Sequence, residues 1–319
     1  MLEIDGLTVE FKTDEGIFYA VDNVSFNINK GEILGLVGES GCGKSVTAMS
    51  IPRLIPSPPG TIKKGSIHFK GRDLLQLNPR EMSKIRGSQI SMIFQEPASA
   101  LSPLHKIGTQ MAEVLLIHNR GMPKKKAIAL SKLWLSKMGI PDIEDKISAL
   151  PHQLSGGMRQ RVMIAMALMM EPDLVIADEP TTALDVTTQS QIFELIKEMK
   201  QTTTSMLLIT HDMGVIWEMC DRVIVMYASK IMEQGSIDHI FSKTAHPYTK
   251  GLLESIPGLN MKKERLKSIP GQVPSPLFYP KGCNFNNRCS IAGEKCQTEK
   301  PKLKEIEPGH MAACFKPLS

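Results

Sequence analysis

The feature that most constrains this chain is the glycine-rich segment GESGCGKS at residues 38–45. It has the form G-x-x-x-x-G-K-S, follows the apolar run at residues 33–37, and precedes a helix-compatible stretch at residues 46–51. A strand, a glycine-rich loop and a helix in this order form the context in which such a loop binds phosphate. Glycines let backbone N–H groups approach phosphate oxygens, Lys44 can reach the outer phosphates, and the Ser45 hydroxyl can bind Mg²⁺. The alternative is a glycine turn followed by a chance Lys-Ser pair.

Length and composition allow one large α/β domain with an appendage, because the chain has 319 residues and 42% of them are hydrophobic. The net charge of +5 is a mild excess, compatible with an anionic nucleotide or a cytoplasmic membrane surface. It is too small to argue for nucleic acid, and we expect no nucleic-acid partner. We see no secretory leader and no apolar stretch that could span a membrane, so we expect a cytosolic chain whose action at a membrane needs other subunits.

Hydrophobic patterning predicts two kinds of sheet. Residues 1–30 alternate apolar and polar side chains, which predicts half-buried antiparallel strands. Three short continuous apolar runs instead favour parallel strands that are covered on both faces. These runs are residues 33–37, 174–177 and 206–209. Helical periodicity lies between them, as in a doubly wound sheet, and a helical insertion is expected at about residues 97–165.

Composition shifts again near Gly251, where prolines become frequent and clear periodicity ends. We place a domain boundary there, with residues 1–250 forming the main domain and residues 251–319 a C-terminal extension. The extension holds four of the six cysteines, and such clustering in a reducing compartment favours a metal over disulfides.

Two adjacent carboxylates follow the apolar run at residues 174–177, namely Asp178 and Glu179. A strand end beside a phosphate loop can aim Asp178 at Mg²⁺, while Glu179 points the other way and can polarise the attacking water. The alternative is an Asp-Glu helix start, because Pro180 and two threonines follow.

A second candidate anion contact is the segment LSGGM at residues 154–158. The Ser155 hydroxyl and the N–H groups after Gly156 and Gly157 form an exposed helix start that can meet an anion. An ordinary serine N-cap with flexible glycines is the alternative, and taken alone it is the better explanation.

In this order the motifs resemble one family closely, the nucleotide-binding subunits of ATP-binding cassette (ABC) transporters. Residues 38–45 resemble the Walker A loop, Gln95 the Q-loop glutamine, and residues 154–158 the signature, with Met158 in place of the commoner glutamine. Residues 174–179 resemble Walker B, Asp185 lies in the D-loop ALD, and His211 resembles the switch histidine. The resemblance implies a P-loop NTPase ABC cassette with an antiparallel β subdomain and a helical subdomain, plus a small Cys-rich C-terminal extension.

The same resemblance implies an ATPase site shared between two head-to-tail cassettes. Lys44, Glu179, His211 and Gln95 would act in hydrolysis, and Asp178 would hold Mg²⁺. The loop residues implied to contact ATP are Gly38, Glu39, Ser40, Gly41, Cys42, Gly43, Lys44, Ser45 and Val46. Ser155, Gly156 and Gly157 would contact the ATP held by the partner cassette.

The aromatic residue that stacks on adenine is less clearly marked. Thr13 occupies the usual aromatic position of the family, and Phe11, Phe18 and Tyr19 lie near it in sequence. Any of the three can stack on the base or fill the core, and we choose Phe11.

Two C-terminal segments narrow the family. Residues 245–257 and 271–289 are similar to the C-terminal extension of oligopeptide and dipeptide permease ATPases, of the D type. This implies import of di- or oligopeptides with a second homologous ATPase, two transmembrane permeases and an extracytoplasmic peptide-binding protein. The chain would then lie peripherally on the cytoplasmic face of the membrane. Nickel or another small solute remains an alternative cargo, and a soluble ABC ATPase acting on DNA or ribosomes remains an alternative function.

The cysteines of the extension have the spacing C-x5-C-x6-C-x17-C, formed by Cys283, Cys289, Cys296 and Cys314. Zinc sites usually contain close C-x2-C pairs, and ferredoxin spacings do not fit either, so the spacing leaves a metal site and buried unpaired thiols both open. The family resemblance favours a 4Fe–4S cluster, with zinc as the alternative metal. Cys42 and Cys220 are expected not to ligate it.

Overall fold

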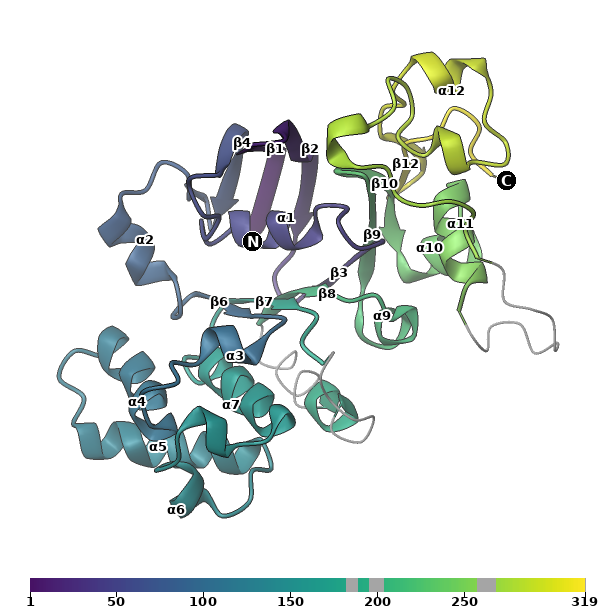
Figure 1. Cartoon of the computed structure of the whole chain (residues 1–319). Helices are drawn as coiled ribbons and strands as arrows, with labels where there is room; N and C mark the ends of the chain where they lie inside the picture. The colour runs from purple at the N-terminus through teal and green to yellow at the C-terminus, as the bar shows by residue number, and fades with distance from the viewer. Residues whose placement is uncertain (182–188, 195–203, 257–267, 319) are drawn as a thin grey trace. The chain divides into compact units, whose positions relative to one another are not determined.

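The computed structural model describes residues 1–181, 189–194, 204–256 and 268–318. It separates into two compact units (Figure 1). Unit 1 consists of Met1–Asn29, Ile33–Gln76 and Ile209–Ser319. Unit 2 consists of Lys30–Glu32 and Leu77–Leu208.

Unit 1 contains an antiparallel sheet with the strand order β2-β1-β4-β5. Its strands are β1 (Leu2–Thr13), β2 (Gly16–Ile28), β4 (Gly60–Phe69) and β5 (Arg72–Asp73). Leu2 and Ile4 of β1 are buried while Glu3 between them is exposed, because successive side chains of a strand point to opposite faces. The antiparallel pairing predicted from the alternation in residues 1–30 is confirmed.

The other strands of unit 1 follow the order β11-β12-β10-β9-β3. Their bounds are β3 (Ile33–Val37), β9 (Arg222–Tyr227), β10 (Lys230–Ser236), β11 (Lys304–Glu307) and β12 (His310–Ala312). β3 pairs in parallel with β9, and all its residues are buried, as the continuous apolar run predicts. β10 is antiparallel to both β9 and β12.

The described residues of unit 1 also form short helices. They are α1 (Lys44–Ser50), α9 (Met213–Met219), α10 (Ile237–Ser242), α11 (Pro247–Glu254) and α12 (Glu294–Thr298), with 3-10 turns η2 (Pro276–Phe278) and η3 (Asn286–Arg288). α9 packs closely on β3, since a Cβ at Gly35 would lie 2.8 Å from Ile216 Cδ1. The expected domain boundary, Gly251, lies inside α11.

The C-terminal hairpin β11–β12 joins the strands of unit 1, which the sequence did not indicate. Glu233 and Gln234 of β10 pair with Ala312 and Met311 of β12, and Ala313 N–H donates to the Met232 carbonyl. β12 has only three residues, too few for an alternating pattern to stand out. It satisfies backbone groups of β10 that would otherwise form an open edge.

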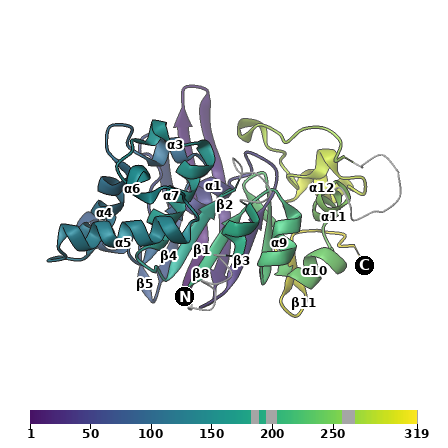
Figure 2. The ribbon, with the colours of Figure 1, turned by 90° about the horizontal axis from the view of Figure 1, so that it is seen from below.

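The described part of unit 2 contains β6, β7 and all of β8 except its last residue, Ile209, with the strand order β8-β7-β6. Their bounds are β6 (Ile90–Ile93), β7 (Leu174–Asp178) and β8 (Ser205–Ile209), and every residue of β7 and β8 is buried. The helices expected after residue 97 are present and group together in Figure 2. Among the described residues, the helices of this unit include α2 (Pro79–Ile85), α3 (Pro97–Ala100), α4 (Ile107–His118), α5 (Lys124–Lys137), α6 (Ile143–Lys146) and α7 (Gly156–Leu168), with the 3-10 turn η1 (Pro151–Gln153). Residues 189–194 are also helical.

Within the described ranges, no helix has both the length and the apolar composition needed to cross a membrane.

Candidate functional site

The glycine-rich loop between β3 and α1 has a conformation that its glycines make possible. Gly38 and Gly43 have φ values of 150° and 105°. A Cβ at Gly38 would lie 2.1 Å from the Met226 carbonyl oxygen, and one at Gly43 would lie 2.3 Å from the Ala20 carbonyl oxygen. Any side chain at these positions would therefore displace the loop from the strands that support it.

Lys44 is the first residue of α1, and its side chain turns back into the loop. Its Nζ donates to the carbonyl oxygens of Gly38 at 2.8 Å and Glu39 at 3.1 Å, and only 7% of the residue is exposed. The ammonium group is thus already at the centre of the curved backbone, where a phosphate would meet it.

A cavity of about 360 Å³ opens beside the loop. Its lining consists of Phe11, Phe18, Ala20, Gly41, Gly43, Lys44, Ser45, Val46 and Pro276. Phe11 and Phe18 are cross-strand partners whose rings stack with centroids 5.7 Å apart and an interplanar angle of 9°. Tyr19 is exposed and Thr13 ends β1. Both phenylalanines, and not Phe11 alone, therefore border the space next to the loop, and Pro276 was not anticipated.

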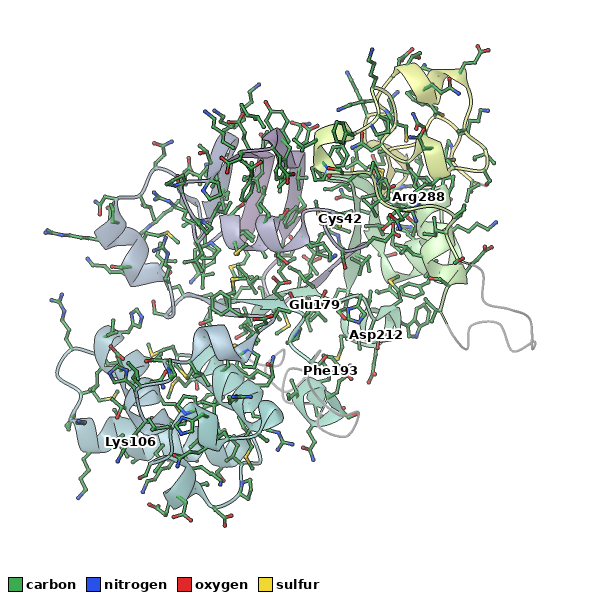
Figure 3. All side chains as sticks on the ribbon, in the orientation of Figure 1. Cys42, Lys106, Glu179, Phe193, Asp212 and Arg288 are labelled. Carbon is green, nitrogen blue, oxygen red and sulfur yellow. The ribbon has the colours of Figure 1, made fainter. Side chains whose placement is uncertain are left out.

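The two carboxylates at the end of β7 differ in environment. Asp178 is 5% exposed, whereas Glu179 is partly exposed and has a positive φ of 47°, which is unusual for a residue with a side chain. Gln95 Nε2 donates to Glu179 Oε2 at 3.1 Å. The structure thus brings together two predicted residues that are distant in the sequence, and it holds Glu179 (labelled in Figure 3) in a strained backbone conformation.

The signature segment forms the start of α7. Ser155 is the N-cap, its Oγ accepts a hydrogen bond from Met158 N–H at 3.2 Å, and its side chain is exposed. A Cβ at Gly156 would meet nothing within 4 Å, so this surface is open. Further along α7, the buried Gln160 donates to the Pro180 carbonyl and so joins the helix to the chain after Glu179. No local sequence pattern indicates this link.

His211 follows β8 and is exposed. The next residue, Asp212, caps α9 by accepting from the N–H groups of Gly214 at 2.8 Å and Val215 at 3.2 Å. This cap fixes the chain direction at the histidine. Asp185 lies outside the described residues. Phe11, residues 38–46 and His211 belong to unit 1, whereas Gln95, Ser155, Gly156, Gly157, Asp178 and Glu179 belong to unit 2.

The four C-terminal cysteines line a common small cavity and form no disulfide. Burial raises the pKa of the Cys283 thiol to about 11 and also raises that of Cys289 and Cys314. Among the described residues, no group of three or more His, Cys, Asp or Glu side chains is arranged to hold a metal ion. The metal site expected at Cys283, Cys289, Cys296 and Cys314 is therefore not supported by the structure.

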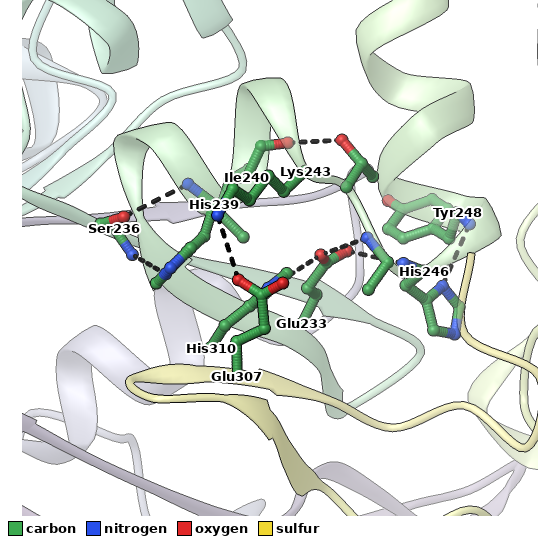
Figure 4. A network of polar contacts seen from close by, with 11 residues as sticks. Glu233, Ser236, His239, Ile240, Lys243, His246, Tyr248, Glu307 and His310 are labelled. Atoms are coloured by element: carbon green, nitrogen blue, oxygen red, sulfur yellow. Dashed lines mark hydrogen bonds and ion pairs between the residues drawn. The ribbon is translucent and has the colours of Figure 1, made fainter. Parts of the chain in front are cut away.

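A buried carboxylate organises the chain before these cysteines (Figure 4). Glu233 is fully buried and accepts from the N–H groups of Ala245 at 2.7 Å and His246 at 2.9 Å. Its Oε1 also lies 2.8 Å from Nε2 of His310 in β12. Burial lowers the pKa of His246 to about 4, and its Nδ1 accepts from Tyr248 N–H at 3.0 Å.

Two family models match the chain. The ABC transporter model matches residues 21–182, and the model of the C-terminal region of oligopeptide/dipeptide transporters matches residues 232–296.

Curated relatives match along nearly the whole length. The probable peptide ABC transporter ATP-binding protein y4tR of Sinorhizobium fredii is 47% identical over 99% of this chain and 95% of its own. The oligopeptide transport ATP-binding protein OppD of Escherichia coli is 46% identical over 100% of this chain and 94% of its own. The dipeptide transport ATP-binding protein DppD of Escherichia coli is 42% identical over 100% and 97%.

A solved structure gives the same assignment for the cassette. The dimeric post-hydrolysis structure of the ATP-binding cassette MJ0796 bound to ADP and Pi aligns with a TM-score of 0.68 and 29% identity. The alignment covers 74% of this chain and 99% of that chain. The expected ABC cassette fold, with mixed sheets and helices, is thus confirmed, and the chain belongs to the ABC transporter family, among the ATP-binding proteins with an oligopeptide/dipeptide transporter C-terminal region.

Proposed function

We propose that this chain hydrolyses ATP to energise the import of di- or oligopeptides through separate membrane subunits. The observation that carries the proposal is the preformed loop at residues 38–45, with the Lys44 ammonium inside it and a cavity bordered by aromatic rings beside it. The relatives named as oligopeptide and dipeptide transport ATP-binding proteins, similar over nearly the full chain, supply the cargo class.

The loop and its neighbours would bind the nucleotide. Backbone N–H groups of residues 39–46 would hold the phosphates, and Lys44 would exchange its carbonyl partners for phosphate oxygens. Ser45 and Asp178 would hold Mg²⁺, which supplies charge neutralisation to the phosphates when bound. Phe11 or Phe18 would stack on the adenine.

Glu179 and Gln95 of unit 2, together with His211 of unit 1, would then promote hydrolysis. Glu179 would orient the water that attacks the γ-phosphorus, with ADP as the leaving group. The amide of Gln95, already bonded to Glu179, would hold that carboxylate until the γ-phosphate arrives. His211 would contact the γ-phosphate and the water.

A second ATPase subunit would complete the site. Ser155, Gly156 and Gly157 at the start of α7 would contact the ATP bound by that subunit, and Asp185 would serve as the D-loop residue. ATP would then bind the closed pair better than the open pair, and this differential affinity is what allows a ligand to drive a conformational change. Two transmembrane permeases and an extracytoplasmic peptide-binding protein would complete the importer, with this chain on the cytoplasmic face of the membrane.

The substitution Glu179→Gln tests this assignment in the complex reconstituted with its partners. We expect ATP binding to persist while turnover falls by about 100-fold or more, because the amide cannot orient the water as a carboxylate does. Lys44→Ala is the comparison variant, in which binding itself should be lost. Normal peptide-stimulated turnover in the Glu179→Gln complex would remove Glu179 from its role.

We further propose that the four cysteines hold a 4Fe–4S cluster. In support, all four line one cavity, and backbone N–H groups of Phe285, Ile291 and Lys316 point at three of the sulfurs. Thiolates are soft ligands that suit iron–sulfur clusters, and N–H groups aimed at sulfur stabilise the thiolate form. A cluster separates its ligand sulfurs more widely than a single ion does, so the absence of a preformed ion site among the described residues bears more strongly against zinc. The bound cluster would supply a structural crosslink.

Analysis of anaerobically purified protein distinguishes these cases. About four iron and four sulfide ions per chain would support the cluster. Both should be lost in Cys289→Ser and retained in Cys220→Ser. Stoichiometric zinc in the parent protein, or no metal in either the parent or Cys220→Ser, would refute the cluster.

A further inference from the structure

The second residue of the glycine-rich loop, Glu39, is held by a residue from the C-terminal part of the chain. Arg288 Nη1 lies 2.6 Å from Glu39 Oε2, and Arg288 Nη2 lies 2.9 Å from Glu39 Oε1. Two parallel charge-assisted bonds of this kind fix orientation as well as distance. Arg288 lies between Cys283 and Cys289, so the segment that bears the cysteines also reaches the loop.

Contacts other than those with Glu39 also hold the Arg288 side chain in place. Its Nε donates to the Pro270 carbonyl at 2.9 Å, and its Nη1 donates to Tyr227 Oη at 3.3 Å. The guanidinium carbon lies 5.6 Å from the ring centroid of Tyr227 and 6.0 Å from that of Phe285. With 8% of the residue exposed, the arginine has little freedom to leave this position (labelled in Figure 3).

The backbone of Glu39 has a second support from the same part of the chain. Its N–H donates to Tyr248 Oη at 2.9 Å, and Tyr248 is fully buried. The Tyr248 ring packs against Tyr227 at 4.7 Å and Phe285 at 5.3 Å between centroids. Glu39 also offers its carbonyl to Lys44 Nζ, so its position bears directly on the lysine.

Because Glu39 is negatively charged, its ion pair with Arg288 affects the binding of an anionic ligand. A carboxylate in a loop that receives polyphosphate repels the ligand unless a cation neutralises it. Arg288 both neutralises this carboxylate and fixes where it points. Without Arg288, the glutamate would be free to approach Lys44 and compete with phosphate for the ammonium group.

We propose that Arg288 is a positioning residue that sets the nucleotide affinity of the loop through Glu39. The inference rests on the proposed function in one respect, that residues 38–45 bind ATP. It extends that function by making a residue of the cysteine-bearing segment part of the support of the phosphate loop.

The first test measures ATP in the complete transporter. We expect Arg288→Gln to raise the KM for ATP by about tenfold, within the range of typical coupling effects, while kcat at saturating ATP stays within about twofold. Arg288→Lys, which keeps the charge but not the two-bond geometry, should fall in between. Lys243→Gln is the matched control, because it removes a cation from an exposed pair with Glu307 and should leave KM unchanged.

The second test is a double-mutant cycle with Glu39→Gln. Because Arg288 acts through Glu39, adding Arg288→Gln to Glu39→Gln should change the Kd for a fluorescent ATP analogue by less than about twofold. Full additivity of the two effects would overturn the proposal, since Arg288 would then act by another route.

Two measurements separate this proposal from loss of folding and from failure of the proposed function. Thermal unfolding without nucleotide shows whether Arg288→Gln lowers the folded fraction. A lower folded fraction would reduce the apparent kcat and leave the KM for ATP unchanged. A reduced kcat with an unchanged KM would therefore refute the proposal. If Lys44→Ala abolishes binding while Arg288→Gln leaves it intact, this inference fails alone. If Lys44→Ala binds ATP normally, the proposed site fails with it.

Discussion

The phosphate loop and the cysteine cavity are both small sites built on turns of unit 1, but they are held together in different ways. The loop is a contiguous segment whose shape follows from backbone sterics at Gly38 and Gly43. The cavity draws its thiols from separate segments, with Cys296 in α12 accepting at its carbonyl from Cys283 N–H at 2.8 Å and Cys314 following β12. The loop thus depends on local conformation, whereas the cavity depends on the packing of segments that carry no conformational signal of their own.

Arg288 nevertheless connects the two sites, because it lies in the cysteine-bearing segment and its guanidinium group binds the Glu39 carboxylate of the loop. Changes to local backbone geometry should therefore affect the loop most strongly. Changes to packing or charge should affect the cysteine cavity most and should change nucleotide binding less.

The largest effect is expected from Gly43→Ala. The new Cβ would lie 2.3 Å from the Ala20 carbonyl oxygen, so the loop must shift, and a misplacement on the order of 1 Å lowers the rate of a positioned reaction by about 100-fold. The ATPase rate of the complex reconstituted with its partners measures the loss. Gly41→Ala is the matched control, since Gly41 has a φ of 78° but open space around its Cβ position, and it should lose far less. Equal losses would mean that sterics do not fix the loop.

A medium effect is expected from the pH dependence of stability at the cysteine cavity. His246 lines the cysteine cavity and is buried, which lowers its pKa from 6.5 to about 4. Between these values the unfolded chain binds the proton and the folded chain does not, so stability is lost as pH falls from 6.5 toward 4. The linked change is on the order of 3 kcal/mol.

His246→Asn isolates this contribution, because asparagine can cap α11 but does not titrate. Urea unfolding at several pH values should show a shallower acid loss in this variant than in the parent. The exposed His152→Asn should behave like the parent. Hydrogen exchange locates the effect, and loss of protection in residues 38–45 before residues 283–289 would contradict the distinction between the two sites.

Contiguous patterns predicted much of this molecule. The alternation in residues 1–30 predicted β1 and β2, and the apolar runs predicted β3, β7 and β8, because burial on one or both faces is encoded by neighbouring residues. The glycine-rich motif was recognisable for the same reason. The motif order also supplied Gln95 and Glu179, although not the hydrogen bond between them.

What the sequence could not supply depends on long-range contacts. Glu39 and Arg288 are 249 positions apart, and nothing in either local pattern marks them as partners. Pro276 and the β12 pairing are similar cases, since a proline in a proline-rich tail and a strand of three residues carry no distinguishing periodicity. The cysteine spacing left a metal site and buried unpaired thiols both open, because the arrangement of the four thiols is set by the packing of whole segments.

The smallest effect is expected at Pro276, where the C-terminal part of the chain borders the nucleotide cavity directly. Its ring faces the same cavity as Phe11 and Phe18, so Pro276→Ala removes apolar contact worth about 0.5 kcal/mol, or roughly a twofold rise in Kd. We expect the lost contact to be with the base or the ribose, which ATP and ADP share, so the affinities for both nucleotides should fall by the same factor. Phe278→Ala is the control, since Phe278 is 78% exposed and does not line the cavity. A larger loss for ATP than for ADP would mean that Pro276 acts on the loop, and the C-terminal part of the chain would then support the phosphates from two positions, Pro276 as well as Arg288.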